Sequence, residues 1–190
     1  MLRILSIDIG TRNMALCGIK WDLCGLTSRK WSTVELIQWE NIDMDQEIRR
    51  GQKRKPLIRD YIDYLVTHIR ATIDENCYDA VVIENQMRAK FQIIAHAIYT
   101  IVKTGFPHVI VGFCSARLKL QCDVNNFTNT VVDRPTKNHA HRKKVASDLT
   151  TVILSKINAT SDMVQKFKNA QKQDDLSDSL LQAIRILQQL

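Results

Sequence analysis

Two acidic residues, Asp8 and Glu84, lie in apolar segments, where a carboxylate is costly unless it is paired or binds a metal. Asp8 is near the end of RILSIDI at 3–9, and Glu84 ends AVVIE at 80–84. Taken alone, Asp8 could cap the following turn, and Glu84 could face solvent at a strand end. Ligand sites in α/β sheets gather at the ends of buried strands, however. The two segments together therefore predict an acidic site carried by two buried strands.

A second pair of acids, Asp175 and Asp178, lies in DDLSDSLLQA at 174–183. Residues three apart share one face of a helix, so these carboxylates are expected side by side. Acids at a helix N-terminus are favoured by the helix dipole and by capping. That accounts for Asp174 well and for Asp178, in the second turn, less well. Because Asp174 and Asp178 also share a face, either Asp174 or Asp175 can be the third acid of the site.

Four such carboxylates can support metal-dependent hydrolysis of a phosphodiester. Mg²⁺ prefers hard oxygen ligands, with water and phosphate completing its shell. Two ions about 3.5–4 Å apart can activate water and relieve charge on the leaving oxygen. Without metal the carboxylates would repel one another. The acid set therefore predicts two Mg²⁺ ions and no small-molecule cofactor.

The apolar patterns predict a mixed α/β sheet flanked by helices to position these acids. Segments at 3–9, 14–21 and 33–39 are typical of strands, and their short connections favour an antiparallel meander. Helical and strand patterns then alternate, which favours helices on the faces of the sheet. The later elements are predicted as helices at 57–76, 90–104, 142–157 and 174–189, and strands at 80–84 and 108–113.

The length and composition suit one compact domain over residues 1–190, since 45% of the residues are hydrophobic and only 6 are Gly and 3 are Pro. No apolar run approaches the roughly 18 residues of a membrane helix, and MLRILSIDIG does not fit a signal peptide. The 5 cysteines are odd in number and include no C-x-x-C pair. Free thiols in a reducing, cytoplasmic compartment are therefore expected, rather than disulfides or a zinc site.

The formal net charge of +7 favours a polyanionic partner. Much of it lies in RRGQKRK at 49–55 and RPTKNHAHRKK at 134–144. A charge run is usually solvated surface, but near a phosphodiester-cleaving site phosphate contact is the preferred interpretation. The residues predicted to contact DNA are Arg49, Arg50, Lys53, Arg54, Gln86, Arg88, Lys90, Lys137, Arg142, Lys143 and Lys144.

The ordered set SIDIGTRN, VVIENQ and DDLSDSLLQA resembles the RNase H-like (retroviral integrase) superfamily. Within it the set is most similar to the RuvC-type Holliday junction resolvases, above all those of poxviruses. The resemblance implies an RNase H-like fold with a five-stranded sheet, a homodimer, and paired nicks in four-way and other branched DNA with Mg²⁺ or Mn²⁺. For a poxvirus enzyme it implies concatemer processing during viral DNA replication in the host cytoplasm.

By motif position, the resemblance implies Asp8 as the first-strand acid, Glu84 as the second-strand acid, and Asp175 with Asp178 as the helical pair. All four are then catalytic residues and metal ligands. Asp174 departs from the family pattern, so the third ligand stays open between Asp174 and Asp175.

The related bacterial enzymes also carry two lysines between the second acid and the last pair. Lys119 in SARLKLQ, and Lys143 or Lys144 in HRKKVAS, lie at comparable places in this chain. The resemblance makes these lysines catalytic candidates. The alternative is that they are solvated helix lysines.

Three other functions compete with this interpretation. DIGT at 8–11 also fits an ATP-binding domain of the actin and sugar-kinase type. Such proteins need two lobes and a second glycine-rich loop, which 190 residues with 6 glycines do not provide. A ribonuclease H or another nuclease of the same fold is the main alternative. A non-catalytic DNA-binding module is disfavoured, because unused clustered carboxylates would only repel bound phosphate.

Overall fold

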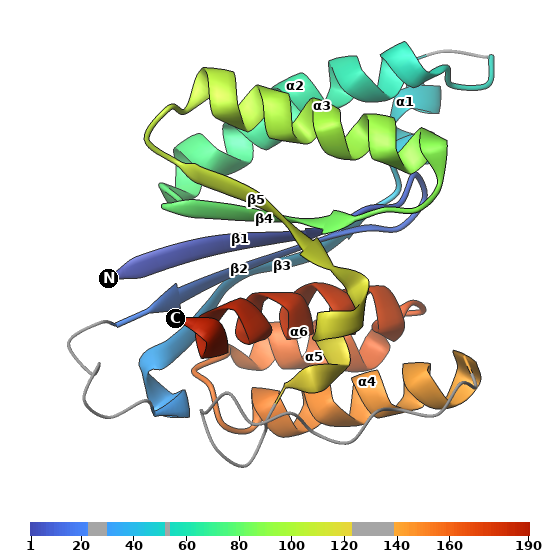
Figure 1. The fold of residues 1–190 in the computed structure, drawn as a ribbon. Coiled ribbons are helices and arrows are strands. Elements are labelled where there is room, and N and C mark those ends of the chain that lie inside the picture. The colour runs from blue at the N-terminus through green and yellow to red at the C-terminus, as the bar shows by residue number, and fades with distance from the viewer. Residues whose placement is uncertain (23–29, 52–53, 123–138) are drawn as a thin grey trace.

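The computed structural model describes residues 1–22, 30–51, 54–122 and 139–190 (Figure 1). These residues form a mixed sheet of five strands in the order β3-β2-β1-β4-β5. β1 pairs antiparallel with β2, and β2 with β3, whereas β1–β4 and β4–β5 are parallel. This confirms the predicted meander with two added parallel strands. The strands are β1 (Leu2–Asp8), β2 (Met14–Trp21), β3 (Val34–Ile42), β4 (Ala80–Asn85) and β5 (Ile110–Ser115).

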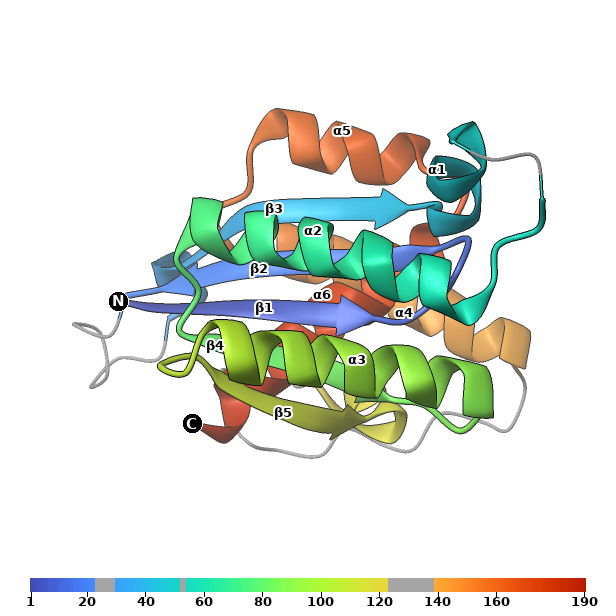
Figure 2. The ribbon, with the colours of Figure 1, turned by 90° about the horizontal axis from the view of Figure 1, so that it is seen from above.

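Helices cover both faces of the sheet, as predicted (Figures 1 and 2). Two long helices and a short one lie on one face: α2 (Ile58–Asn76), α3 (Ala89–Gly105) and α1 (Met44–Arg50). The other face carries α6 (Gln173–Gln189), with α4 (His139–Leu154) and α5 (Ser161–Asn169) around it. A 3-10 helix, η3 (Ala116–Gln121), follows β5.

Each strand divides its side chains between two cores, because successive residues of a strand point to opposite faces. Leu5 and Ile7 of β1 belong to the core beneath α2 and α3. Ile4 of β1 and Val82 of β4 belong to the core against α6. Asp8 and Glu84 have the same parity as Ile4 and Val82. Both predicted acids therefore face α6.

The long elements were predicted more accurately than the short ones. The predicted inner stripe of the last helix is buried in α6, as Leu176, Leu180, Ile184 and Leu187. By contrast, α1, α5 and η3 were missed. Each has at most nine residues, which is too few turns for a hydrophobic period to stand out. α5 is instead begun by the Thr160 side chain, which accepts a hydrogen bond from Met163 N at 3.3 Å.

Some predicted features lie outside the described residues. These are Lys53, Lys137 and most of the basic segment at 121–141. In the part of the chain that is described, no helix has both the length and the apolar character needed to cross a bilayer. The cysteines described there are free thiols, as expected: Cys17, Cys77, Cys114 and Cys122.

Candidate active site

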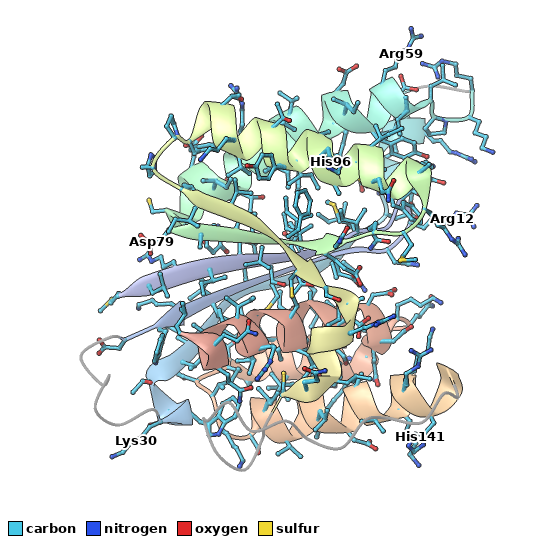
Figure 3. The ribbon with its side chains drawn as sticks, viewed as in Figure 1. Arg12, Lys30, Arg59, Asp79, His96 and His141 are labelled. Carbon is cyan, nitrogen blue, oxygen red and sulfur yellow. The ribbon has the colours of Figure 1, made fainter. Side chains whose placement is uncertain are left out.

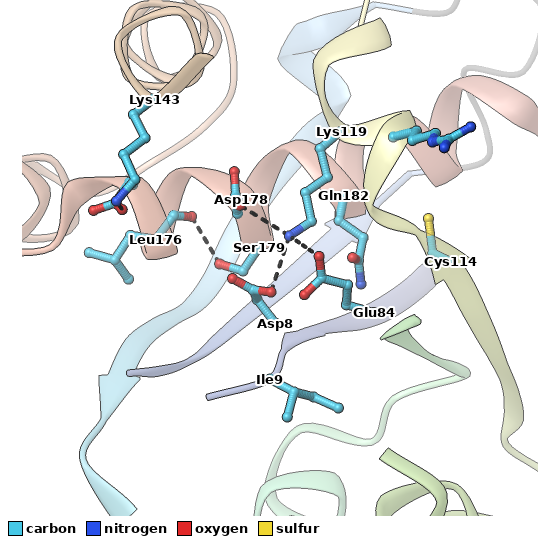
Figure 4. Close-up of polar contacts among 12 residues, drawn as sticks. Asp8, Ile9, Glu84, Cys114, Lys119, Lys143, Leu176, Asp178, Ser179 and Gln182 are labelled. Atoms are coloured by element: carbon cyan, nitrogen blue, oxygen red, sulfur yellow. Dashed lines mark hydrogen bonds and ion pairs between the residues drawn. The ribbon is translucent and has the colours of Figure 1, made fainter. Parts of the chain in front are cut away.

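Lys119 lies at the centre of a buried acidic cluster (Figure 4). Its Nζ is 3.1 Å from Asp8 Oδ1, 2.9 Å from Glu84 Oε1 and 3.2 Å from Asp178 Oδ2. The Lys119 side chain is only 3% exposed. The cluster therefore joins β1, β4, η3 and α6, which are distant in sequence, through one ammonium group.

Strand register and chain reversal bring these side chains together. β1 and β4 are parallel, with Ile7 opposite Ile83. The next residues, Asp8 and Glu84, therefore lie on neighbouring strands at the same edge of the sheet. After β5, the Ser115 side chain accepts a hydrogen bond from Arg117 N at 3.4 Å and begins η3. The six residues of η3 then carry Lys119 back over the strand ends. The cluster thus depends on an element that the sequence patterns did not reveal.

Gln182 fixes α6 against the two acid-bearing strands. It lies one turn beyond Asp178 and is fully buried. Its Nε2 donates to Ile7 O at 3.4 Å and to Val82 O at 3.2 Å. A further hydrogen bond, from Trp39 Nε1 to Leu176 O at 3.0 Å, holds the first turns of α6 to β3. These hydrogen bonds set the position of Asp178 relative to Asp8 and Glu84.

Electrostatics in the cluster favour a cation among the acids. Burial lowers the pKa of Lys119, but attraction to Asp8, Asp178 and Glu84 outweighs it, and the net pKa is raised. Burial raises the pKa of Asp8, with Lys119 opposing and Glu84 adding to the shift. Burial likewise raises the pKa of Asp178. Since three carboxylates face one ammonium, the cluster keeps a negative excess that further positive charge would relieve.

Asp174 and Asp175, adjacent on α6, have opposite environments. Asp174 forms an ion pair with Lys143 of α4, and although burial opposes it, this contact lowers the pKa of Asp174. Asp175 Oδ2 is buried and has no hydrogen-bond partner among the residues that the structure describes. Burial, followed by repulsion from Asp174 and Asp8, raises the pKa of Asp175 to about 6. Asp175 therefore offers a buried acceptor that is unsatisfied.

The α6 acids open onto a hollow of about 330 Å³. Its lining shows which predicted residues the fold brings together: Lys119, Arg142, Lys143, Asp174, Asp175 and Asp178. Lys144 is exposed on α4 and is not part of this lining. Among the described residues, no three His, Cys, Asp or Glu side chains are arranged to bind one metal ion directly. We attribute this to Lys119 Nζ, which takes the space between the acids.

Several solved structures of similar architecture are Holliday junction resolvases. The yeast mitochondrial Holliday junction resolvase Ydc2 has a TM-score of 0.66 at 11% identity, over 98% of this chain and 78% of that one. The fowlpox virus Holliday junction resolvase has a TM-score of 0.61 at 19% identity, over 100% of both chains. Thermus thermophilus RuvC has a TM-score of 0.60 at 14% identity, over 97% and 92%.

This chain has the RNase H-like fold of the resolvases. That confirms the predicted fold class. In sequence comparisons, no protein-family model matches the chain, and no curated protein matches it.

Several predicted DNA contacts have partners within this fold. Gln86 Nε2 donates to Glu84 Oε2, so this residue also belongs to the acid cluster. Arg50 pairs with Glu47 at 2.8 Å. Arg54 forms two hydrogen bonds to Asp60, at 2.7 and 2.8 Å. Phosphate contact by these arginines would have to compete with the carboxylates they already bind.

The remaining predicted DNA contacts lie on the surface near the strand ends. Arg88 is exposed and precedes α3, and Lys90 lies in its first turn. Arg49 of α1 lines a second hollow together with Arg12, which was not predicted.

Sequence patterns missed Gln182 and Arg12 for different reasons. Gln182 had a usable signal, because it is the one polar residue in the apolar run LLQAI at 180–184. Arg12 follows the first acid in a turn, where a basic residue is ordinarily solvated.

Proposed function

We propose that this chain is a metal-dependent endonuclease that resolves four-way DNA junctions. The observation that most supports this is the convergence of Asp8, Glu84 and Asp178, from three separate elements, on one cation. Carboxylates gathered in this way suit metal-dependent phosphodiester hydrolysis. The fold supports the choice of substrate, since several proteins that share it are Holliday junction resolvases.

The oxygen donors of the acid cluster suit a divalent cation, which would displace Lys119 Nζ from the space between the acids. The buried, unpartnered Oδ2 of Asp175 supplies an acceptor that a cation would satisfy, whereas Asp174 is already paired with Lys143. We therefore assign Asp8, Glu84, Asp175 and Asp178 as ligands of Mg²⁺, with Mn²⁺ as a substitute and two ions per site. When bound, the metal would activate water and relieve charge on the leaving oxygen.

The lysines have distinct proposed roles. Lys119 holds the acids together through its ammonium group. Its buried charge also places it to stabilise negative charge that develops on the reacting phosphate. Lys143 lines the hollow at the acids, so we favour it over Lys144 for contact with the scissile phosphate. Arg142 lines the same hollow and would bind the backbone nearby.

The substrate geometry implies a symmetric assembly. A four-way junction presents two equivalent strands, and a twofold homodimer supplies two matched sites, so we propose paired nicks by such a dimer. The similarity to the fowlpox enzyme extends over both full chains. It supports a role in processing branched or concatemeric DNA during viral replication in a reducing cytoplasm.

A panel of substrates tests the proposal. The protein would be incubated with a four-way junction, a linear duplex of the same arm sequence and an RNA–DNA hybrid, each with Mg²⁺, Mn²⁺ or EDTA. We expect paired nicks in the junction with Mg²⁺ or Mn²⁺, and none in EDTA. Preferential cutting of the hybrid would instead show a ribonuclease H. Nicking in EDTA would remove the metal from the account.

A further inference from the structure

A buried hydrogen bond joins α2 to α1 beside the strand ends. The Tyr61 hydroxyl donates to Asp45 Oδ1, and Tyr61 is 1% exposed. Burial, followed by the Asp45 carboxylate, raises the pKa of Tyr61 to about 12, so the phenol stays a donor. The backbone N–H of Asp45 donates to Thr11 O at 2.9 Å, which fixes the loop after β1 to α1. We call Asp45 and Tyr61 the bracket.

Two cations converge on the bracket, Arg12 from the loop after β1 and Lys90 from the first turn of α3. Arg12 Nε lies 3.5 Å from Asp45 Oδ2. Lys90 Nζ lies 3.3 Å from the Tyr61 hydroxyl oxygen and 4.3 Å from the centroid of its ring, which is a cation–π contact. Arg12 thus contacts the carboxylate of the bracket, and Lys90 contacts its hydroxyl and ring. The local positive excess attracts an anion such as a backbone phosphate.

Arg12 is held by the bracket but not covered by it. Its side chain is 74% exposed, and the ion pair with Asp45 uses Nε, so the terminal amino groups are accessible from solvent. A guanidinium fork is suited to bidentate phosphate binding. The residue opens onto a hollow of about 500 Å³ lined by Arg12, Asp43, Asp45, Gln46, Arg49 and Arg50.

The two cations follow the two strand acids in the chain, after β1 and after β4. Arg12 follows the first acid by four residues, in the loop after β1, and Lys90 follows the second acid by six, at the start of α3. Figure 3 places Arg12 at the same end of the molecule as His141 of α4, on the other side of the sheet. At the end of the molecule where the acid-bearing strands finish, α4 supplies basic residues on one face of the sheet, and Arg12 and Lys90 supply them on the side of α1 and α3.

We propose that Arg12 and Lys90 bind a backbone phosphate of the DNA strand on the α1 side of the acids, and that the bracket positions them. This inference rests on the proposed function and adds a phosphate subsite to it. Contacts on both flanks would fix where the strand crosses the acids, because phosphate contacts set register without reading bases. Arg12 and Lys90 are thus binding residues, whereas Asp45 and Tyr61 act through them.

Charge removal tests the subsite. Arg12→Gln and Lys90→Gln should each weaken junction binding, and should each lower the slope of log affinity against log salt by about 0.9. Arg70→Gln on α2 and Lys103→Gln on α3 are matched controls, since both residues are exposed. Lys103 lies thirteen residues beyond Lys90 on the same helix, or about 20 Å. The control variants should keep the wild-type slope.

A double-mutant cycle tests the positioning role. Tyr61→Phe keeps the ring and removes the hydroxyl that contacts Lys90 and Asp45. We expect it to weaken binding in the wild-type background and to have little further effect in Lys90→Gln, because coupled residues are not additive. Thermal unfolding would be measured in parallel. A Tyr61→Phe variant that loses stability but keeps wild-type junction affinity would show that the bracket is only structural.

The salt titration, together with junction nicking, distinguishes a failure of the phosphate subsite from a failure of the proposed function. If the wild-type protein neither binds nor nicks the junction, the proposed function fails. If the wild type binds and nicks while Arg12→Gln and Lys90→Gln keep the salt slope of the Arg70→Gln and Lys103→Gln controls, only the subsite is wrong. A lower slope in both test variants, with unchanged controls, supports it.

Discussion

The two faces of the sheet differ in what they bury. Between the sheet and α2 and α3, the core is almost wholly aliphatic and aromatic, with Leu65, Ile69 and Tyr61 among its members. The face against α6 buries many polar side chains together with its apolar ones. They are Ser6, Asp8, Glu84, Lys119, Thr150, Ser177, Ser179, Gln182, Arg185 and Gln188.

This difference separates stabilisation from chemistry. Apolar burial is favourable and non-directional, so the α2 and α3 face holds the fold without needing exact partners. Buried polar groups are costly unless they are hydrogen-bonded. Some atoms on the α6 face, including Ser177 Oγ and Arg185 Nε, have no hydrogen-bond partner within the described part of the chain. The α6 face therefore gives up stability to keep a charged cluster in place, as functional sites commonly do.

Removing the central cation should have the largest effect. Lys119→Met leaves three carboxylates without their shared ammonium, and breaking a buried ion pair typically costs about 3–5 kcal/mol. Mg²⁺ should recover part of this loss, because a ligand that binds only the folded state stabilises it. Denaturant unfolding with and without Mg²⁺ measures both effects. A loss below about 1 kcal/mol, in the range of a surface pair, would contradict the account.

A cavity in the opposite core should lower stability by a similar or smaller amount without changing the chemistry. Leu65 on α2 is fully buried, and Leu65→Ala should cost about 2–4 kcal/mol through lost burial and the remaining cavity. Single-turnover nicking at saturating protein should stay at the wild-type rate at a temperature where the variant is folded. A rate loss in the fully folded variant would mean that the two faces are not separable.

Loss of the Gln182 amide should affect the chemistry more than stability. Gln182→Leu keeps the bulk but removes the bonds to Ile7 O and Val82 O. We expect a stability change of about 1–2 kcal/mol. A small displacement of Asp178 can lower the rate by up to about 100-fold. Nicking by the variant should therefore slow by at least about tenfold.

Exposed Gln189, on the same helix, supplies the matched control Gln189→Leu. If Gln182→Leu nicks as fast as this control, Gln182 has no positioning role.

Asp175→Asn should give a small gain in stability without metal. Burial raises the pKa of Asp175 from 3.8 to about 6, so its stabilising contribution is present at low pH and is lost as pH rises through that value. At pH 8 the variant should be more stable by about 1 kcal/mol, after allowance for partial exposure. The gain should vanish near pH 4, since the wild-type carboxyl is then protonated. Unfolding curves at both pH values, with and without Mg²⁺, check this, and a loss of stability at pH 8 without metal would contradict it.

Long elements with a regular apolar pattern were easier to predict from the sequence than short ones. The strand that ends at Asp8 and the helix that carries Asp178 have clear apolar periods, so the fold class and the acids could be proposed early. Lys119 was proposed only from a family resemblance, because a lysine in a six-residue 3-10 helix carries no periodic signal. The preference for Asp175 over Asp174 depends on the Lys143 contact. This contact is tertiary and not visible in a sequence pattern.

We propose that the acids around Lys119 form a metal-dependent nuclease centre. The most direct test is single-turnover nicking of a four-way junction in Mg²⁺ by Asp178→Asn, compared with Asp63→Asn. Asp63 is exposed on α2, on the opposite face of the sheet, and its variant carries the same change in charge. The account predicts that Asp178→Asn binds the junction but does not nick it, while Asp63→Asn nicks at the wild-type rate. Nicking by Asp178→Asn at the rate of Asp63→Asn would contradict it.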